Sequence, residues 1–272
     1  MKNVYWKSIG AVLLFLIMQA VVSAVMLAGR LVMNPGMLKK IAESGFNPSD
    51  MASLNTPSLL SLVVIVSGII TCFILWRKKM IRMPEAWDCG SIRWKPALIG
   101  VLGVVLGVMA TDLASEQLNL PDIIKAEMQG MVGTIWGMLA VGVVGPIVEE
   151  LVFREGIQGT MLRSGVRPWK AMLFSALLFG LIHVNPAQVP FTFVVGLMLA
   201  VIYQVTGNVV VTSLIHILNN SIAVAEINVL GEHADDFSYA EWLGLSPVTV
   251  WIPIALLALL CVLLLRLFSR RY

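Results

Sequence analysis

Long apolar runs alternate with short polar connections along the whole chain. Most of these runs approach the ~20 residues that a helix needs to cross the hydrocarbon core of a bilayer. Each span must be helical, because lipid offers the backbone no hydrogen-bond partners. The pattern predicts an all-α, polytopic transmembrane bundle of about eight helices with a short fifth helix. The runs lie at about 9–33, 58–76, 96–114, 131–162, 169–184, 189–206, 208–228 and 247–268.

Composition agrees with a membrane protein. Of the 272 residues, 58% are hydrophobic and only 13% are charged, which is too little charge for the surface of a soluble protein of this length. Since no polar stretch is long enough for a separate soluble domain, we expect residues 1–272 to form a single transmembrane domain. The net charge of +3 is small and gives no case for a nucleic-acid partner. The three cysteines, Cys72, Cys89 and Cys261, share no metal-ligand spacing and predict no disulfide framework.

The charges of the connections predict the orientation. Lys and Arg predominate in the connections at 77–95 and 163–170 and at the C-terminus, whereas acids collect in the connections that an eight-span topology places on the other side. Because basic residues prefer the cytoplasmic side, we expect a multi-pass protein, in the plasma membrane, with both termini cytoplasmic.

The fourth apolar run contains charged residues, and ionisable groups within spans are candidates for function. Glu150 and Arg154 are four residues apart, so they share a helix face and can pair. Glu149 lies about 100° around an α-helix from Glu150 and cannot readily share Arg154. The spacing therefore predicts one paired carboxylate and one free carboxylate, and the free one is a candidate proton acceptor.

Two later runs contribute imidazoles. His183 ends the fifth run, four residues after Phe179, and His216 lies four residues before Asn220 in the seventh. At 1.5 Å per residue, Glu149, His183, His216 and Asn220 lie roughly 12 to 20 Å along their helices from the cytoplasmic ends. A buried polar cluster at this depth would suit the activation of water and the stabilisation of an oxyanion.

Other interpretations use the same residues. Polar side chains within spans also serve as contacts between helices. A proton-coupled transporter would need buried acids and histidines too, although such proteins often contain paired repeats, and this sequence shows none. A non-catalytic membrane scaffold or bacteriocin-immunity protein is the third alternative.

The three motifs, taken together and in this order, resemble those of the CPBP (Abi) family, which includes the type II CAAX prenyl endopeptidases and their bacterial relatives. That family's pattern is E-E-x-x-x-R, then F-x-x-x-H, then H-x-x-x-N. Here it reads Glu149-Glu150…Arg154, Phe179…His183 and His216…Asn220, in a core of about 131–228.

The resemblance implies an eight-helix intramembrane endopeptidase. It implies that Glu149 and His183 activate the attacking water and that His216 and Asn220 stabilise the oxyanion. Glu150 and Arg154 would shape and neutralise the site, with Phe179 packed beside it.

The resemblance also implies a membrane-associated peptide or protein as substrate, in some family members a prenylated CAAX tail. It leaves two options for cofactors, none or a divalent metal such as zinc. The sequence contains no H-E-x-x-H zinc motif, but Glu149, His183 and His216 could ligate a metal if they converge.

Overall fold

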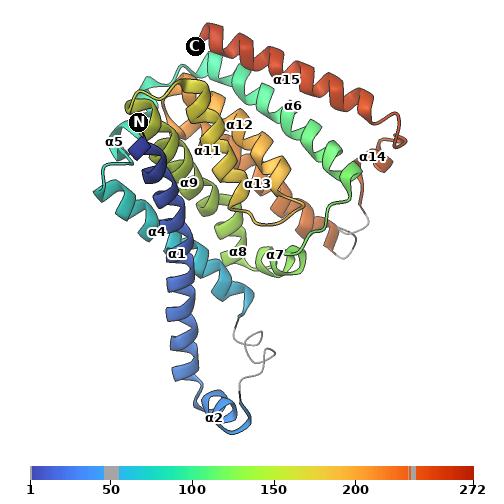
Figure 1. Cartoon of the computed structure of the whole chain (residues 1–272). Coiled ribbons are helices and arrows are strands. Elements are labelled where there is room, and N and C mark those ends of the chain that lie inside the picture. The colour runs from blue at the N-terminus through green and yellow to red at the C-terminus, as the bar shows by residue number, and fades with distance from the viewer. Residues whose placement is uncertain (1, 46–54, 232, 234–236) are drawn as a thin grey trace.

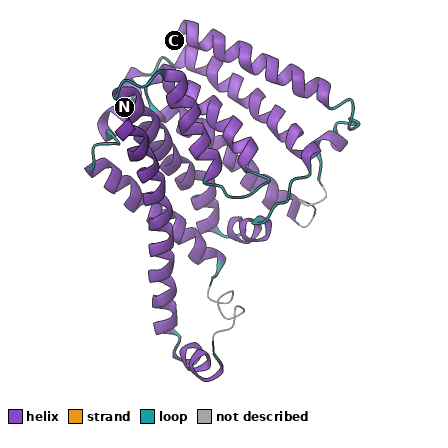
Figure 2. Ribbon diagram, in the orientation of Figure 1, coloured by secondary structure: helices purple, strands orange, loops and turns teal. Residues whose placement is uncertain are grey.

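The computed structural model describes residues 2–45, 55–231, 233 and 237–272. Over these ranges the secondary structure is helical, with no strand (Figure 2). Seven helices are long and apolar enough to cross a membrane, and an eighth apolar helix, α11, is shorter, at 14 residues. The chain is thus an all-α, multi-pass integral membrane protein, as predicted, and its fifth apolar helix is indeed short.

Seven of the eight apolar helices, the short α11 included, follow the predicted runs closely. They are α1 (Lys2–Met33), α4 (Pro57–Arg77), α6 (Trp94–Leu118), α11 (Pro168–Leu181), α12 (Val189–Thr206), α13 (Val209–Leu230) and α15 (Trp251–Arg271). Short helices lie in the connections: α2 (Pro35–Ser44), α5 (Met83–Ala86), η1 (Cys89–Ser91), α7 (Lys125–Val132) and α14 (Tyr239–Trp242).

The fourth span differs in detail from its predicted run. It begins at Ile135 rather than at 131, because residues 131 and 132 end the separate helix α7. It also changes helix type along its length, and two of its segments are π-helical. In order, the span comprises α8 (Ile135–Leu139), η2 (Ala140–Val144), α9 (Gly145–Glu149), η3 (Glu150–Gly159) and α10 (Thr160–Arg163).

Peripheral helices surround this span. α15 packs along α6, α11 along α12, and α1 along α4, while η3 lies among α1, α11 and α13 (Figure 1). The contact between α6 and α15 is close because α6 presents glycines. A Cβ on Gly103 would lie 3.1 Å from Leu264 Cβ, and one on Gly107 would lie 2.8 Å from Cys261 Sγ. Small residues of this kind let membrane helices approach closely.

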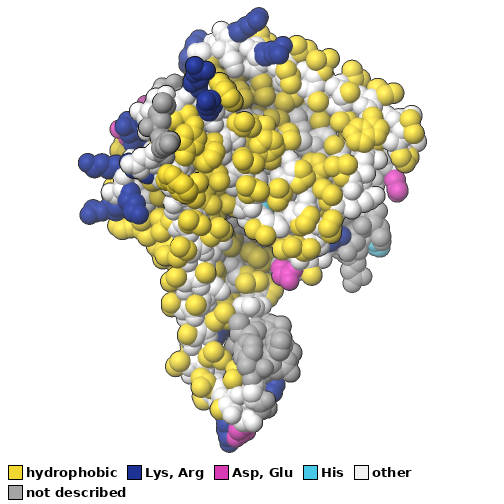
Figure 3. All heavy atoms as spheres, in the orientation of Figure 1, with side chains coloured by type: hydrophobic (Ala, Val, Ile, Leu, Met, Phe, Trp, Pro, Cys, Tyr) yellow, Lys and Arg dark blue, Asp and Glu magenta, His cyan; other side chains and the backbone are white. Residues whose placement is uncertain are grey.

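Both termini lie at the same end of the molecule, the upper end in Figure 1. Most Lys and Arg side chains visible in Figure 3 lie at this end too. Hydrophobic side chains cover most of the rest of the visible face. This arrangement fits the even number of crossings expected from the sequence. That this end faces the cytoplasm remains a prediction.

Candidate active site

A proline in the fourth span removes one backbone donor where α13 packs. Pro146 has no N–H, so the carbonyls of Val141 and Gly142, five and four residues earlier, lack that helical donor. Asn220 Nδ2 donates to the Val141 carbonyl at 3.1 Å. Ser221 Oγ donates to the Gly142 carbonyl at 3.3 Å. Because an unpaired carbonyl is costly in a bilayer, these two hydrogen bonds fix α13 against the fourth span.

The next segment, η3, buries a charged pair. In a π-helix the hydrogen bonds span five residues rather than four, and all ten residues of η3 are buried. Arg154 Nε donates to Glu150 Oε2 at 2.9 Å, and Nη2 donates to Oε1 at 3.4 Å. Neither side chain is exposed. This is the pair that the spacing of four predicted, and mutual neutralisation lets both groups stay charged in the interior.

Arg154 is held from two further directions by groups near α11. Its guanidinium lies over the Phe179 ring, 5.0 Å from the centroid. Its Nη1 lies 3.5 Å from Ser175 Oγ, which itself donates to the Phe153 carbonyl at 2.7 Å. These contacts fix the position of the guanidinium and therefore of the Glu150 carboxylate.

His216 lies between the two adjacent glutamates. Its Nδ1 is 3.1 Å from Glu150 Oε1, and its Nε2 is 3.6 Å from Glu149 Oε2. Because the Glu150 carboxylate is paired with Arg154 and can only accept, Nδ1 carries the proton and donates it. The other ring nitrogen, Nε2, therefore faces Glu149.

Glu149 ends α9 and differs sharply from its neighbour. Its side chain is 19% exposed, and its Oε2 is buried without a hydrogen bond to any described residue. It makes no contact with Arg154 in the described part of the chain, as the sequence predicted. Since nearly all buried polar atoms in proteins are hydrogen-bonded, this oxygen is available to accept a proton or a hydrogen bond.

His183 lies just beyond the C-terminal end of α11. Its Nδ1 is 2.9 Å from the Phe179 carbonyl. A carbonyl can only accept, so Nδ1 is the donor, and the neutral imidazole keeps a lone pair on Nε2. The Phe179 ring meets His183 and His216 edge to face, at centroid distances of 5.1 and 5.7 Å. One aromatic ring thus separates the two imidazoles.

The turn after His183 has its own support. Val184 has a φ of +53°, which a β-branched residue rarely adopts. Asn185 is fully buried, donates to Asp122 Oδ1 at 2.8 Å and accepts from the Ile123 N–H at 3.2 Å. These bonds to the segment after α6 hold the turn in place.

Asn220 lies one helical turn along α13 from His216. Its Oδ1 accepts from Asn219 Nδ2 at 3.1 Å, while one N–H of Nδ2 serves the Val141 carbonyl. The amide orientation is therefore fixed from both sides, and the second N–H of Nδ2 stays available.

The structure thus joins Glu149, Glu150, Arg154 and His216 in one polar network. His183 adjoins it through Phe179, and no described contact joins His183 directly to Glu149. Asn220 shares a helix with His216 but does not touch the glutamates through any described hydrogen bond.

The candidate metal ligands do not converge as a metal site. Among the described residues, no group of three His, Cys, Asp or Glu side chains is placed to hold an ion. His216 directs Nδ1 to Glu150, so of the three candidates only its Nε2 and Glu149 approach each other. As placed, the residues do not fit a metal with three protein ligands.

Sequence reasoning missed several supporting residues. Pro146 carried a signal, since a proline inside an apolar span removes a backbone donor. The sequence signal for Asn185 and Asp122 was weaker: both are polar residues beside the end of a span. Ser175 and Ser221 carried none, because a serine in a membrane helix usually bonds its own backbone.

The segment that holds the candidate site residues is similar to known proteins. Residues 131–222 match the family model described as "Type II CAAX prenyl endopeptidase Rce1-like". A protein of Bacillus subtilis (strain 168), named "Putative membrane peptidase YdiL", is 23% identical over 199 residues, which cover 69% of this chain and 79% of that protein. No solved structure matches the chain significantly. The resemblance inferred from the three motifs is thereby confirmed: the segment that matches the Rce1-like family model of type II CAAX prenyl endopeptidases holds every candidate site residue.

Proposed function

We propose that this protein is an intramembrane endopeptidase that hydrolyses a peptide bond of a membrane-associated protein or peptide. One observation carries the proposal: His216 lies between two adjacent carboxylates, of which Glu150 is neutralised by Arg154 and Glu149 is unpaired. A structural ion pair needs only one acid. The second acid has one carboxylate oxygen, Oε2, that is buried without a hydrogen bond to a described residue, which suits a proton acceptor.

Glu149 acts as the general base. It takes a proton from a water molecule while the water oxygen forms a bond to the scissile carbonyl carbon. The same carboxylic acid then gives its proton to the leaving nitrogen as the C–N bond breaks. His183 Nε2 accepts a hydrogen bond from the water's other O–H, which stays on the oxygen, and so orients the attack, because its Nδ1 is committed to the Phe179 carbonyl.

Asn220 and His216 stabilise the oxyanion. Asn220 offers the second N–H of an amide whose orientation is already fixed, and such a preorganised donor costs little reorganisation during the reaction. His216 donates through Nε2 only when doubly protonated, since Nδ1–H serves Glu150. No step is assigned to a metal, because the candidate ligands do not converge.

We infer that the substrate is membrane-associated, because the site is built on helices that are long and apolar enough to cross a membrane. The family name points to prenylated CAAX-type tails, and the related Bacillus protein is named only as a peptidase. We infer a peptide or protein substrate in the plasma membrane, with both termini of the enzyme and the basic end of the bundle on the cytoplasmic side.

The test is cleavage of a membrane-tethered peptide, prenylated and unprenylated, by purified protein in lipid vesicles. Glu149→Gln preserves the size of the side chain, but the amide cannot accept the proton, so we expect kcat to fall by about 10²–10⁴-fold. His183→Ala should fall by a similar factor. Glu127→Gln and His233→Ala, which alter exposed side chains, are matched controls and should cleave normally.

Wild-type turnover by Glu149→Gln would refute the endopeptidase assignment. Solute or proton flux that depends on Glu149, with no cleavage of any peptide, would favour the transporter instead. In-cell function that survives Glu149→Gln would favour the non-catalytic immunity protein.

A further inference from the structure

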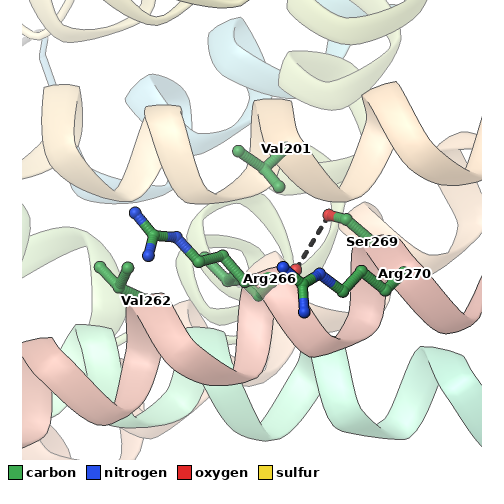
Figure 4. A pocket seen from close by; sticks show the side chains of 6 residues that line it. Val201, Val262, Arg266, Ser269 and Arg270 are labelled. Atoms are coloured by element: carbon green, nitrogen blue, oxygen red, sulfur yellow. Dashed lines mark hydrogen bonds between the residues drawn. The ribbon is translucent and has the colours of Figure 1, made fainter.

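A groove lies between α12 and α15, close to the C-terminal end of α15. It encloses a cavity of about 430 Å³, and Figure 4 shows the side chains that line it. They are Val201 from α12 and Val262, Leu265, Arg266, Ser269 and Arg270 from α15. This groove takes no part in the site described above.

Two unpaired cations line this groove. Arg266 and Arg270 are exposed, and neither forms an ion pair or a side-chain hydrogen bond with a described residue. Ser269 Oγ donates to the Leu265 carbonyl at 2.9 Å, so its oxygen can only accept a further bond. Like charges four residues apart on a helix repel one another. A bound anion would remove that repulsion, and no acidic side chain lines the groove to do so.

The rest of the lining is apolar. Val201, Val262 and Leu265 form a hydrocarbon wall beside the two guanidinium groups. α15 packs on α6 along its other side, and exposed leucines such as Leu259 and Leu263 continue along its surface. The groove is therefore open to lipid, and it combines an apolar wall with cations at the basic end of the molecule.

We propose that this groove binds an anionic phospholipid, with the phosphate between Arg266 and Arg270 and an acyl chain along Val201 and Val262. Guanidinium groups hold phosphate oxygens through paired hydrogen bonds. Basic pockets between membrane helices bind anionic headgroups for the same reason. A free phosphate would leave the apolar wall uncovered, so the groove favours a lipid over a soluble ion.

The experiment measures lipid retention by the full chain, using native mass spectrometry from a neutral detergent. Phosphatidylglycerol, phosphatidylcholine and inorganic phosphate are the three probes. We expect the wild type to bind phosphatidylglycerol about 10–30-fold more tightly than phosphatidylcholine, given the attraction per basic residue near an anionic headgroup. The double variant Arg266→Gln/Arg270→Gln should lose that preference.

The matched control is Arg167→Gln/Arg271→Gln, which removes two exposed arginines from the same end without touching the groove. It should keep the preference. Val201→Trp fills the groove without changing charge and should weaken phosphatidylglycerol binding by at least about fivefold, since a bulky ring would displace the acyl chain.

Three outcomes would overturn the proposal. The first is equal retention of the two lipids by the wild type. The second is that the control variant loses the preference for phosphatidylglycerol as fully as Arg266→Gln/Arg270→Gln does. The third is displacement of the lipid by an equal concentration of inorganic phosphate. Because the readout is binding, the result does not depend on the endopeptidase assignment.

Discussion

The helical segments η3 and α15 meet opposite environments. All ten residues of η3 are buried, among them Glu150, Arg154 and Gln158. α15 is a regular, mostly apolar helix of 21 residues, yet the structure buries only Cys261 and Phe268 of it. In a soluble protein we would expect the opposite: a charged segment such as η3 would be exposed to water and an apolar helix such as α15 would be buried.

The contrast follows from the solvent. Lipid tails are as apolar as leucine, so exposed leucines on α15 cost nothing. Charged groups must instead find partners inside the protein. In η3 the Glu150 carboxylate and the Arg154 guanidinium are such partners, 2.9 Å apart and both fully buried.

The largest expected effect comes from breaking the buried pair. Arg154→Ala leaves the Glu150 carboxylate buried and without its cation, so the free energy of unfolding should fall by about 3–5 kcal/mol. Unfolding at increasing mole fractions of sodium dodecyl sulfate measures it. Arg154→Met combined with Glu150→Gln removes both charges and should recover much of the loss. A single variant as stable as the wild type would show that the pair is not desolvated.

A smaller effect is expected from the amide on α13. Asn220→Ala removes one oxyanion donor, so kcat for peptide cleavage should fall by about 10²–10³-fold. Asn228 is the control, because its Nδ2 donates to the Val132 carbonyl at 3.0 Å in a similar helix contact far from the site. If Asn228→Ala lowers kcat equally, the role of Asn220 is only to hold helices together.

The smallest effect is expected on the lipid-facing surface. Leu259 is 55% exposed, and lipid can fill the space left by Leu259→Ala, so the unfolding free energy should change by less than about 0.5 kcal/mol. The same detergent titration measures it. A loss above about 2 kcal/mol would mean that protein, not lipid, covers this side of α15.

Much of the fold followed from the sequence because membrane spans are governed by length and apolarity. The run at 208–228 became α13 (Val209–Leu230), and the short run at 169–184 became the short α11. The Glu150–Arg154 pair also followed, since it depends only on spacing along one helix.

Contacts between helices could not be derived in this way. Counting residues placed His216 and Glu149 within one slab of the membrane, roughly 12 to 20 Å from the cytoplasmic ends, but not with each ring nitrogen of His216 toward a different glutamate. That arrangement depends on the π-helical form of η3 and on the backbone donor that Pro146 lacks. A count based on 3.6 residues per turn takes account of neither the π-helical form nor the proline. Whether Glu149, His183 and His216 converge as metal ligands, which the sequence left open, likewise depends on contacts between helices.

The shortness of α11 has a consequence for any peptide that reaches the site. Fourteen residues extend about 21 Å, less than the ~30 Å thickness of the hydrocarbon core, so His183, two residues beyond the end of α11, lies within the thickness of that core. A helical segment keeps its carbonyls occupied by its own amides and shields them from attack. The peptide must therefore unwind locally beside Phe179, and segments rich in glycine or proline should unwind most easily.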